Sequence, residues 1–124
     1  MARTQTIWKS TEPMWSEEFY LNVFSPDVSL CNVTVWKMEK GSKGEIAGKV
    51  EIPVRSLMDQ RQHDQWYPLV PANAAEYVAG EVHVKLEYKP FTGTQEGGLL
   101  IQVIEGRNLA AKGAGGVSNP YVKV

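Results

Sequence analysis

The sequence predicts an all-β fold, an antiparallel β-sandwich of eight strands. Apolar and polar residues alternate along most of the chain, whereas the spacing typical of an amphipathic helix is nearly absent. The alternating segments have the length of strands, and turn-forming residues separate them. Eight short strands suit a closed sandwich of two antiparallel sheets. The expected strands are residues 5–9, 17–23, 29–37, 46–53, 64–69, 80–88, 99–105 and 121–124.

In the first half of the chain the alternation is clearest in residues 29–37. Val33 and Val35 alternate there with larger or more polar neighbours, so one face of this strand is expected to be buried. The same period continues through strands 5–9, 17–23 and 46–53, and a helical turn is expected at residues 54–58 before strand 64–69.

In the second half, residues 80–88 alternate most regularly, with Val82, Val84 and Leu86 on one face. A loop of small residues is expected before this strand, at residues 71–78. After it, residues 89–98 contain one proline and three glycines and predict a linker or a long turn, either native or engineered.

Composition limits the classes of protein that this chain can belong to. With 124 residues and 43% apolar content, the chain is expected to form one globular domain. No apolar run approaches the roughly 20 residues that a membrane-spanning helix needs. Thirteen basic and fourteen acidic residues give a net charge of -1, which argues against a nucleic-acid partner. The single cysteine, Cys31, excludes an internal disulfide, and no secretory signal is visible, so a cytoplasmic location is expected.

Several segments resemble parts of the C2 domain, the membrane-binding sandwich of protein kinase C and the synaptotagmins. Residues 99–109, Leu-Leu-Ile-Gln-Val-Ile-Glu-Gly-Arg-Asn-Leu, and residues 118–124, Ser-Asn-Pro-Tyr-Val-Lys-Val, resemble its second and third strands. Residues 6–19 resemble its fourth and fifth strands, Gly48 matches the glycine after its third calcium loop, and residues 66–69 and 80–88 are typical of the family as well. The resemblance implies an eight-stranded Greek-key sandwich.

These segments occur in a rotated order within a single C2-like domain, residues 1–124. Residues 1–88 resemble the later strands plus the usual first strand, and residues 99–124 resemble the second and third. The chain is therefore interpreted as a circular permutant or as a segment cut across two tandem modules. In either case the last strand is expected to pair antiparallel with the first, which places Arg3 close to Lys123 and both termini at one end of the sheet. A monomer is favoured, and a strand-swapped dimer with residues 89–98 as hinge is the rival.

The resemblance implies that calcium binding is weak or lost. Calcium needs several hard oxygen ligands, which the family supplies as aspartates from two loops. The matching positions here are Gly113 and Asn119 in the first loop and Lys37, Glu39 and Glu45 in the third. No metal cofactor is therefore expected. Glu39, Glu45 and Asn119 are the remaining weak candidates for a calcium site.

The same loops suggest a calcium-independent contact with anionic lipids. If they converge as in the family, Lys37, Lys40, Lys43 and Lys112 share one end of the sandwich. Each basic residue near an anionic membrane contributes about 1 kcal/mol, so four together would matter. The alternative is that these lysines are simply solvated.

A second candidate lipid site lies on the sheet face, where some family members bind phosphoinositide headgroups. Arg3, Trp36, Tyr121 and Lys123 match the family's positions, while Gln5 replaces one lysine. Arg3 and Lys123 offer donors to phosphate, and Trp36 offers a flat apolar wall. The alternative is that the aromatic residues merely pack on a pleated surface.

Catalysis finds no support in the residue patterns. There is no catalytic triad order, zinc-ligand spacing or phosphate loop. The favoured function is a peripheral, membrane-targeting module in the cytoplasm that binds anionic phospholipids or phosphoinositides without calcium. The alternative is a protein-interaction or structural domain, which could be an engineered scaffold, with no lipid activity.

Overall fold

The computed structural model describes residues 3–6, 12–37, 45–71, 80–93, 96–109 and 120–124. These residues form seven strands and one short helix, which confirms the all-β prediction, with seven strands in place of the eight expected. The helix, η1, confirms the turn expected near residue 54. The elements are β1 (Met14–Val23), β2 (Leu30–Lys37), β3 (Glu45–Pro53), η1 (Val54–Leu57), β4 (His63–Pro68), β5 (Glu81–Pro90), β6 (Gly97–Arg107) and β7 (Pro120–Lys123).

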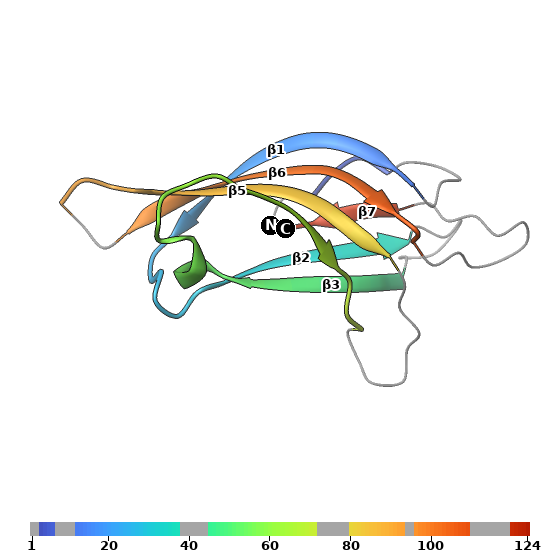
Figure 1. The fold of residues 1–124 in the computed structure, drawn as a ribbon, viewed down its shortest axis with the longest axis horizontal. Helices are drawn as coiled ribbons and strands as arrows, with labels where there is room; N and C mark the ends of the chain where they lie inside the picture. Colours follow the sequence, from blue (N-terminus) through green and yellow to red (C-terminus); the bar gives the residue numbers. More distant parts are fainter. Residues whose placement is uncertain (1–2, 7–11, 38–44, 72–79, 94–95, 110–119) are drawn as a thin grey trace, which may run out of the picture.

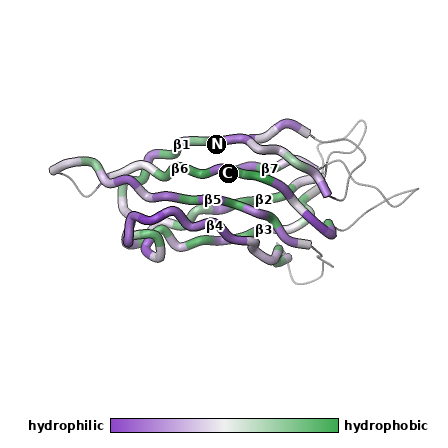
Figure 2. Tube along the Cα trace, turned by 45° about the horizontal axis from the view of Figure 1, so that its top comes forward, coloured by the Kyte–Doolittle hydropathy of each residue, from purple (hydrophilic) through white to green (hydrophobic). Residues whose placement is uncertain are grey.

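The strands form two antiparallel sheets that pack face to face (Figure 1). One sheet has the order β1-β6-β5-β4, and the other has the order β3-β2-β7. Hydropathy changes repeatedly along the strands because alternate side chains point to the core and to the surface (Figure 2). The inward side chains of both sheets are almost inaccessible to solvent, among them Val33, Val35, Val82, Val84 and Ile101.

The predicted pairing between the two ends of the chain is confirmed at the residues that are described. Arg3 forms an isolated antiparallel bridge with Lys123 at the edge of β7 that faces away from β2. Beside it, the Thr4 amide donates to the carbonyl of Val122 over 2.8 Å. Arg3 and Lys123 are therefore neighbours although they lie near opposite ends of the sequence. Most of the strand expected at residues 5–9 falls outside the described residues.

The glycine-rich segment that suggested a linker is the turn of a hairpin between β5 and β6. Lys89 pairs with Gly98 and Pro90 with Gly97, so the ladder runs almost to the turn. The tyrosine rings explain the two glycines, because the Tyr88 ring lies where a side chain on Gly97 would have to fit, and the Tyr20 ring does the same at Gly98. The folded hairpin pairs β6 with β5, and the oligomeric state stays a prediction.

Candidate functional site

The outer face of the three-stranded sheet brings together the four residues expected at the sheet-face site. Val35 of β2 and Val122 of β7 point into the core, with no exposed surface. Their neighbours in sequence therefore point outward, because side chains alternate along a strand. The register pairs Trp36 with Tyr121 and Thr34 with Lys123, so two cross-strand rows lie next to each other on this face.

Thr4 holds the N-terminal segment against β7. Its hydroxyl accepts a hydrogen bond from the Val122 amide at 2.9 Å, while its own amide donates to the Val122 carbonyl. The residue is only 2% exposed, so these bonds are shielded from water. Neighbouring Arg3 is thereby fixed on the outer face, beside Lys123.

Two cations lie over two aromatic rings at this face. The Arg3 guanidinium carbon is 4.0 Å from the centre of the Tyr121 ring. The Lys123 ammonium is 4.4 Å from the Trp36 ring centre and 5.9 Å from that of Tyr121. The two rings are nearly parallel, with centres 6.2 Å apart. Cations within about 6 Å of a ring centre are attracted by its negative face, so the rings orient both positive groups.

The charges of Arg3 and Lys123 are not neutralised by any described carboxylate, because neither residue forms an ion pair within the described part of the chain. The contrast with Arg107 on the other sheet is direct. Arg107 also lies over an indole, 3.9 Å from the Trp66 ring centre, but it forms an ion pair with Glu81 at 3.0 Å. Arg3 and Lys123 are therefore left with donors for an external anion.

The indole N–H of Trp36 is a buried donor beside these cations. Its nitrogen is shielded from solvent and has no hydrogen-bond partner among the described residues. An unsatisfied buried donor costs about 1–3 kcal/mol, so this indole is held in place at an energetic cost. Tyr121 is 2% exposed, so it contributes the surface of its ring rather than an accessible hydroxyl.

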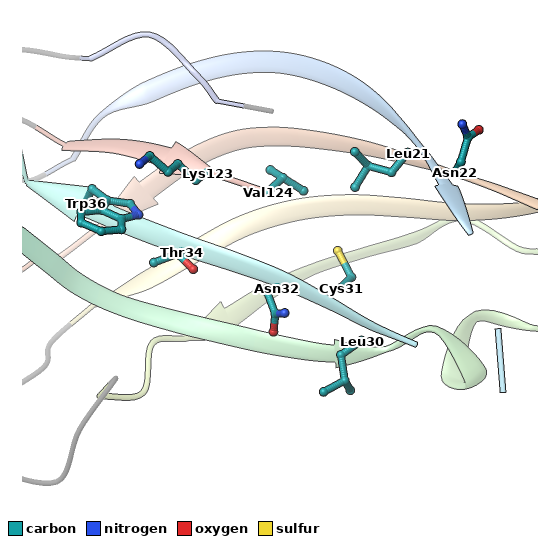
Figure 3. A pocket seen from close by; sticks show the side chains of 9 residues that line it. All are labelled: Leu21, Asn22, Leu30, Cys31, Asn32, Thr34, Trp36, Lys123 and Val124. Atoms are coloured by element: carbon teal, nitrogen blue, oxygen red, sulfur yellow. The ribbon is translucent and has the colours of Figure 1, made fainter. Parts of the chain in front are cut away.

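A cavity of about 460 Å³ adjoins this cluster, between the sheets at the end of β7. Figure 3 shows Leu21 and Val124 on one side of it and β2 residues on the other. Trp36 and Lys123 belong both to this cavity and to the cation–aromatic cluster. The full lining is Leu21, Asn22, Leu30, Cys31, Asn32, Thr34, Trp36, Lys123 and Val124.

The loop candidates fall largely outside the described residues. This holds for Lys40, Lys43 and Lys112, and for two of the weak calcium candidates, Glu39 and Asn119. Only the backbones of Lys37 and Glu45 are placed, and they pair with each other at the end of the β2–β3 ladder. Neither the lysine cluster nor the calcium site can be assembled from the described residues, in which no group of three or more potential acidic, histidine or cysteine metal ligands gathers.

Sequence reasoning missed two parts of this region, the Thr4 anchor and the cavity. The alternation around Val122 could have indicated that a neighbouring strand would meet this residue, but not that a threonine hydroxyl would replace one backbone bond. The cavity depends on how residues of β1, β2 and β7, which are far apart in the sequence, come together.

The chain is similar in sequence to a known domain family and to several known proteins. The profile of the C2 domain family matches residues 1–69 and 97–124. A Ras GTPase-activating-like protein, ngap, of Dictyostelium discoideum is 33% identical over 111 residues, which are 87% of this chain and 12% of that protein. Ras GTPase-activating protein 4 of Mus musculus is 32% identical over 98% of the chain and 15% of its own length. Synaptotagmin-7 of Mus musculus is 29% identical over 98% of the chain and 30% of its own length.

The chain thus spans less than a third of each of these relatives, so the activities in their names are not assigned to it. No solved structure matches the chain significantly. Within the described residues there is no helix long and apolar enough to cross a membrane.

Proposed function

The chain belongs to the C2 domain family, whose members are non-catalytic modules for membrane or protein interaction. We propose that it is a cytoplasmic, peripheral membrane-targeting module. In this proposal it binds anionic phospholipids or phosphoinositides without calcium. The observation that supports this proposal is the pair of cations, Arg3 and Lys123, held over Tyr121 and Trp36 without a carboxylate partner in the described chain.

The chemistry of this cluster suits a phosphorylated headgroup. A guanidinium and an ammonium give charge-assisted hydrogen bonds to phosphate oxygens, which are stronger than bonds between neutral groups. The Trp36 ring offers a flat apolar wall beside the Lys123 ammonium. Because the rings already orient both cations, less side-chain freedom is lost when the headgroup binds.

The loop lysines provide a second contact in this proposal. Lys37, Lys40, Lys43 and Lys112 would add about 1 kcal/mol each near an anionic surface, which suits a domain that reaches the membrane without a metal. Calcium independence rests on the ligand positions, where a lysine, a glycine and an asparagine replace three of five acidic residues. The repulsion between Lys37 and a dication would weaken any remaining site further.

Vesicle sedimentation tests the proposal. Vesicles of phosphatidylcholine alone, with phosphatidylserine, or with phosphatidylinositol 4,5-bisphosphate are mixed with the protein in EDTA or in calcium. We expect binding to both anionic vesicles in EDTA, stronger for the phosphoinositide and little changed by calcium.

The double variant Arg3→Gln/Lys123→Gln should lose the preference for the phosphoinositide. The matched control is Arg107→Gln, which removes a cation that also lies on an indole but is already paired with Glu81, so its binding should equal that of the parent protein. Failure to sediment with any anionic vesicle would contradict the proposal and favour a protein-interaction or structural role.

A further inference from the structure

The Arg3 side chain also faces a hydroxyl of its own segment. Its guanidinium Nη2 donates a hydrogen bond to Thr6 Oγ1 at 3.2 Å, while the guanidinium carbon lies 4.0 Å from the Tyr121 ring centre. The Thr6 hydroxyl is therefore within hydrogen-bond distance of a cation that the lipid proposal uses. A charged group attached to this hydroxyl would lie at the cation–aromatic cluster.

Two contacts fix the short segment between Arg3 and Thr6. Thr4 is bound to Val122 of β7 through both its amide and its hydroxyl. The Gln5 amide donates to the Glu17 carboxylate of β1 at 2.7 Å. Because the two middle residues are anchored on different strands, the flanking arginine and threonine are held in position relative to each other.

The two threonines of this segment differ in access. Thr4 is 2% exposed, and its hydroxyl is used twice, because it accepts the Val122 amide and donates to the Gln5 carbonyl. Thr6 is partly exposed, and its hydroxyl accepts the Arg3 bond at the surface. Of the two, Thr6 is therefore the hydroxyl that another enzyme can modify.

The local sequence selects the same hydroxyl. Arg3 precedes Thr6 by three residues. Many serine/threonine kinases recognise their substrates by charge pattern and select a basic residue at this spacing. Thr4 lacks this feature, because Met1 stands three residues before it. Spacing and exposure are independent observations, and both point to Thr6.

A phosphate on Thr6 would compete directly with a lipid headgroup. It carries a charge of about -1.5 to -2 at pH 7 and three acceptor oxygens. It would therefore cancel most of the positive charge that Arg3 and Lys123 offer to an anionic lipid. An arginine so close can pair with two phosphate oxygens at once. Because the phosphate is attached to the same chain, its effective concentration at Arg3 exceeds that of a free ligand.

We propose that Thr6 is a phosphorylation site for a basophilic serine/threonine kinase, and that its phosphate pairs with Arg3 and closes the cation–aromatic cluster to lipid headgroups. This inference rests on the proposed lipid binding and adds its regulation. In the reaction the Thr6 oxygen attacks the γ-phosphorus of ATP, the bond to the β-phosphate oxygen breaks, and ADP leaves. The hydroxyl proton passes to a carboxylate base of the kinase.

The kinase and the fold compete for Arg3. A kinase binds its substrate as an extended segment, so the guanidinium must leave the Tyr121 ring before the phosphate is transferred. The two bonds between Thr4 and Val122 oppose this release. Phosphorylation of the folded protein is therefore limited by local opening of the segment, which the spacing of the sequence alone does not predict.

Calmodulin-dependent protein kinase II, which selects arginine three residues before its acceptor, tests the site on the full chain. Mass spectrometry should find phosphate on Thr6 and none on Thr4. Arg3→Gln should slow modification of Thr6 at least tenfold, whereas Arg107→Gln, the matched control, should react at the parent rate. No phosphate on Thr6, or an unchanged rate in Arg3→Gln, would overturn the proposal.

Variants of Thr4 test the competition between kinase and fold. Thr4→Val loses the hydroxyl that accepts the Val122 amide, so the segment should open more often and Thr6 should be phosphorylated at least fivefold faster than in the parent. Thr4→Ser keeps this hydroxyl and should react more slowly than Thr4→Val. Equal rates for the two variants would overturn the proposed competition for Arg3.

Phosphothreonine installed at position 6 during translation tests the consequence for lipid binding. Its sedimentation with vesicles that contain phosphatidylinositol 4,5-bisphosphate should be at least tenfold weaker than that of the unmodified protein. The matched control carries phosphothreonine in place of Thr92, an exposed residue of the β5–β6 turn, and should bind within threefold of the unmodified protein. Thr6→Val, which adds no charge, should bind within twofold. Equal binding by the two phosphorylated proteins would overturn the proposal.

Phosphorus NMR without lipid separates this inference from the lipid proposal. The second pKa of the phosphate on Thr6 should be lower in the parent than in Arg3→Gln, because the guanidinium stabilises the dianion. If the unmodified protein failed to sediment with the vesicles, the lipid proposal would fail, and a lowered pKa would still support the pairing with Arg3. An equal phosphate pKa in both proteins would overturn this inference whatever the lipid result.

Discussion

Replacing Thr4 with valine tests the link between the N-terminal segment and β7. Valine has nearly the same shape as threonine, so the change chiefly removes the hydroxyl that accepts the Val122 amide at 2.9 Å. Thr4 is 2% exposed, and an amide left unsatisfied in such a place costs about 1–3 kcal/mol. Since 1.4 kcal/mol is a factor of ten, docking of the segment should weaken by roughly five- to 150-fold.

Hydrogen exchange at the Val122 amide is the most direct assay, because it reports the opening of this contact and not only of the whole fold. We expect faster exchange at Val122 by that factor in Thr4→Val, with core amides such as Val84 affected less. Phosphoinositide binding should fall in parallel, because Arg3 is held over the Tyr121 ring by its neighbour.

The control is Thr4→Ser, which keeps the hydroxyl and loses one methyl group at a cost of about 0.8 kcal/mol. If both variants exchanged the Val122 amide at the same rate, the hydroxyl would not be the anchor. The reasoning that places Arg3 through Thr4 would then be refuted.

Three further predictions concern calcium, the loops and the thiol. Millimolar calcium should not raise the melting temperature. A ligand at 100 times its dissociation constant would add about 2.7 kcal/mol to the free energy of unfolding, which raises the melting temperature by several degrees. Such a rise in calcium would contradict calcium independence. Lys37→Glu/Lys40→Glu should abolish binding to phosphatidylserine vesicles. Binding by the parent protein should weaken with salt, because the Debye length falls from about 10 Å at 0.1 M to about 3 Å at 1 M. Unchanged binding by the double variant would show that these loops do not make the contact. Burial raises the pKa of the Cys31 thiol from 9.0 to about 11. Between these pH values the folded state keeps a proton that the unfolded state releases. About 2–3 kcal/mol of stability that is present below pH 9 should therefore be lost as the pH rises to 11. Urea unfolding of Cys31→Ala should lack this loss, and an identical pH profile for both proteins would contradict it.

The fold could be predicted because its signals are local. Alternating residues such as Val33 and Val35 report which face of a strand is buried, and the observed burial follows that pattern. The segment before β6 was harder to interpret, because Gly97 and Gly98 are typical of a linker. These glycines leave room for the rings of Tyr88 and Tyr20, which reach them from neighbouring strands. This role cannot be inferred from the segment itself.

The site could be predicted in part for the same reason. Residues such as Trp36 and Lys123 were expected on one face, and the structure brings them together. The Thr4 anchor and the position of Arg3 over Tyr121 could not be foreseen, because they depend on which residue of the N-terminal segment meets Val122. Those features follow from pairing between residues far apart in the sequence. The loop lysines remain a prediction.

The side-by-side position of Arg3 and Lys123 determines how this fold responds to tension. Pulling on residues 3 and 124 would load the end pairing across the strands, so that the Arg3–Lys123 bridge and the two Thr4–Val122 bonds would carry the force before the rest of the sheet. Strands that are sheared lengthwise must lose all their bonds at once and withstand more force. The first step of such peeling would lift Arg3 from the Tyr121 ring and separate it from Lys123 while both sheets stay folded. A modest pull between these residues would therefore disrupt the cation–aromatic cluster long before it unfolded the domain.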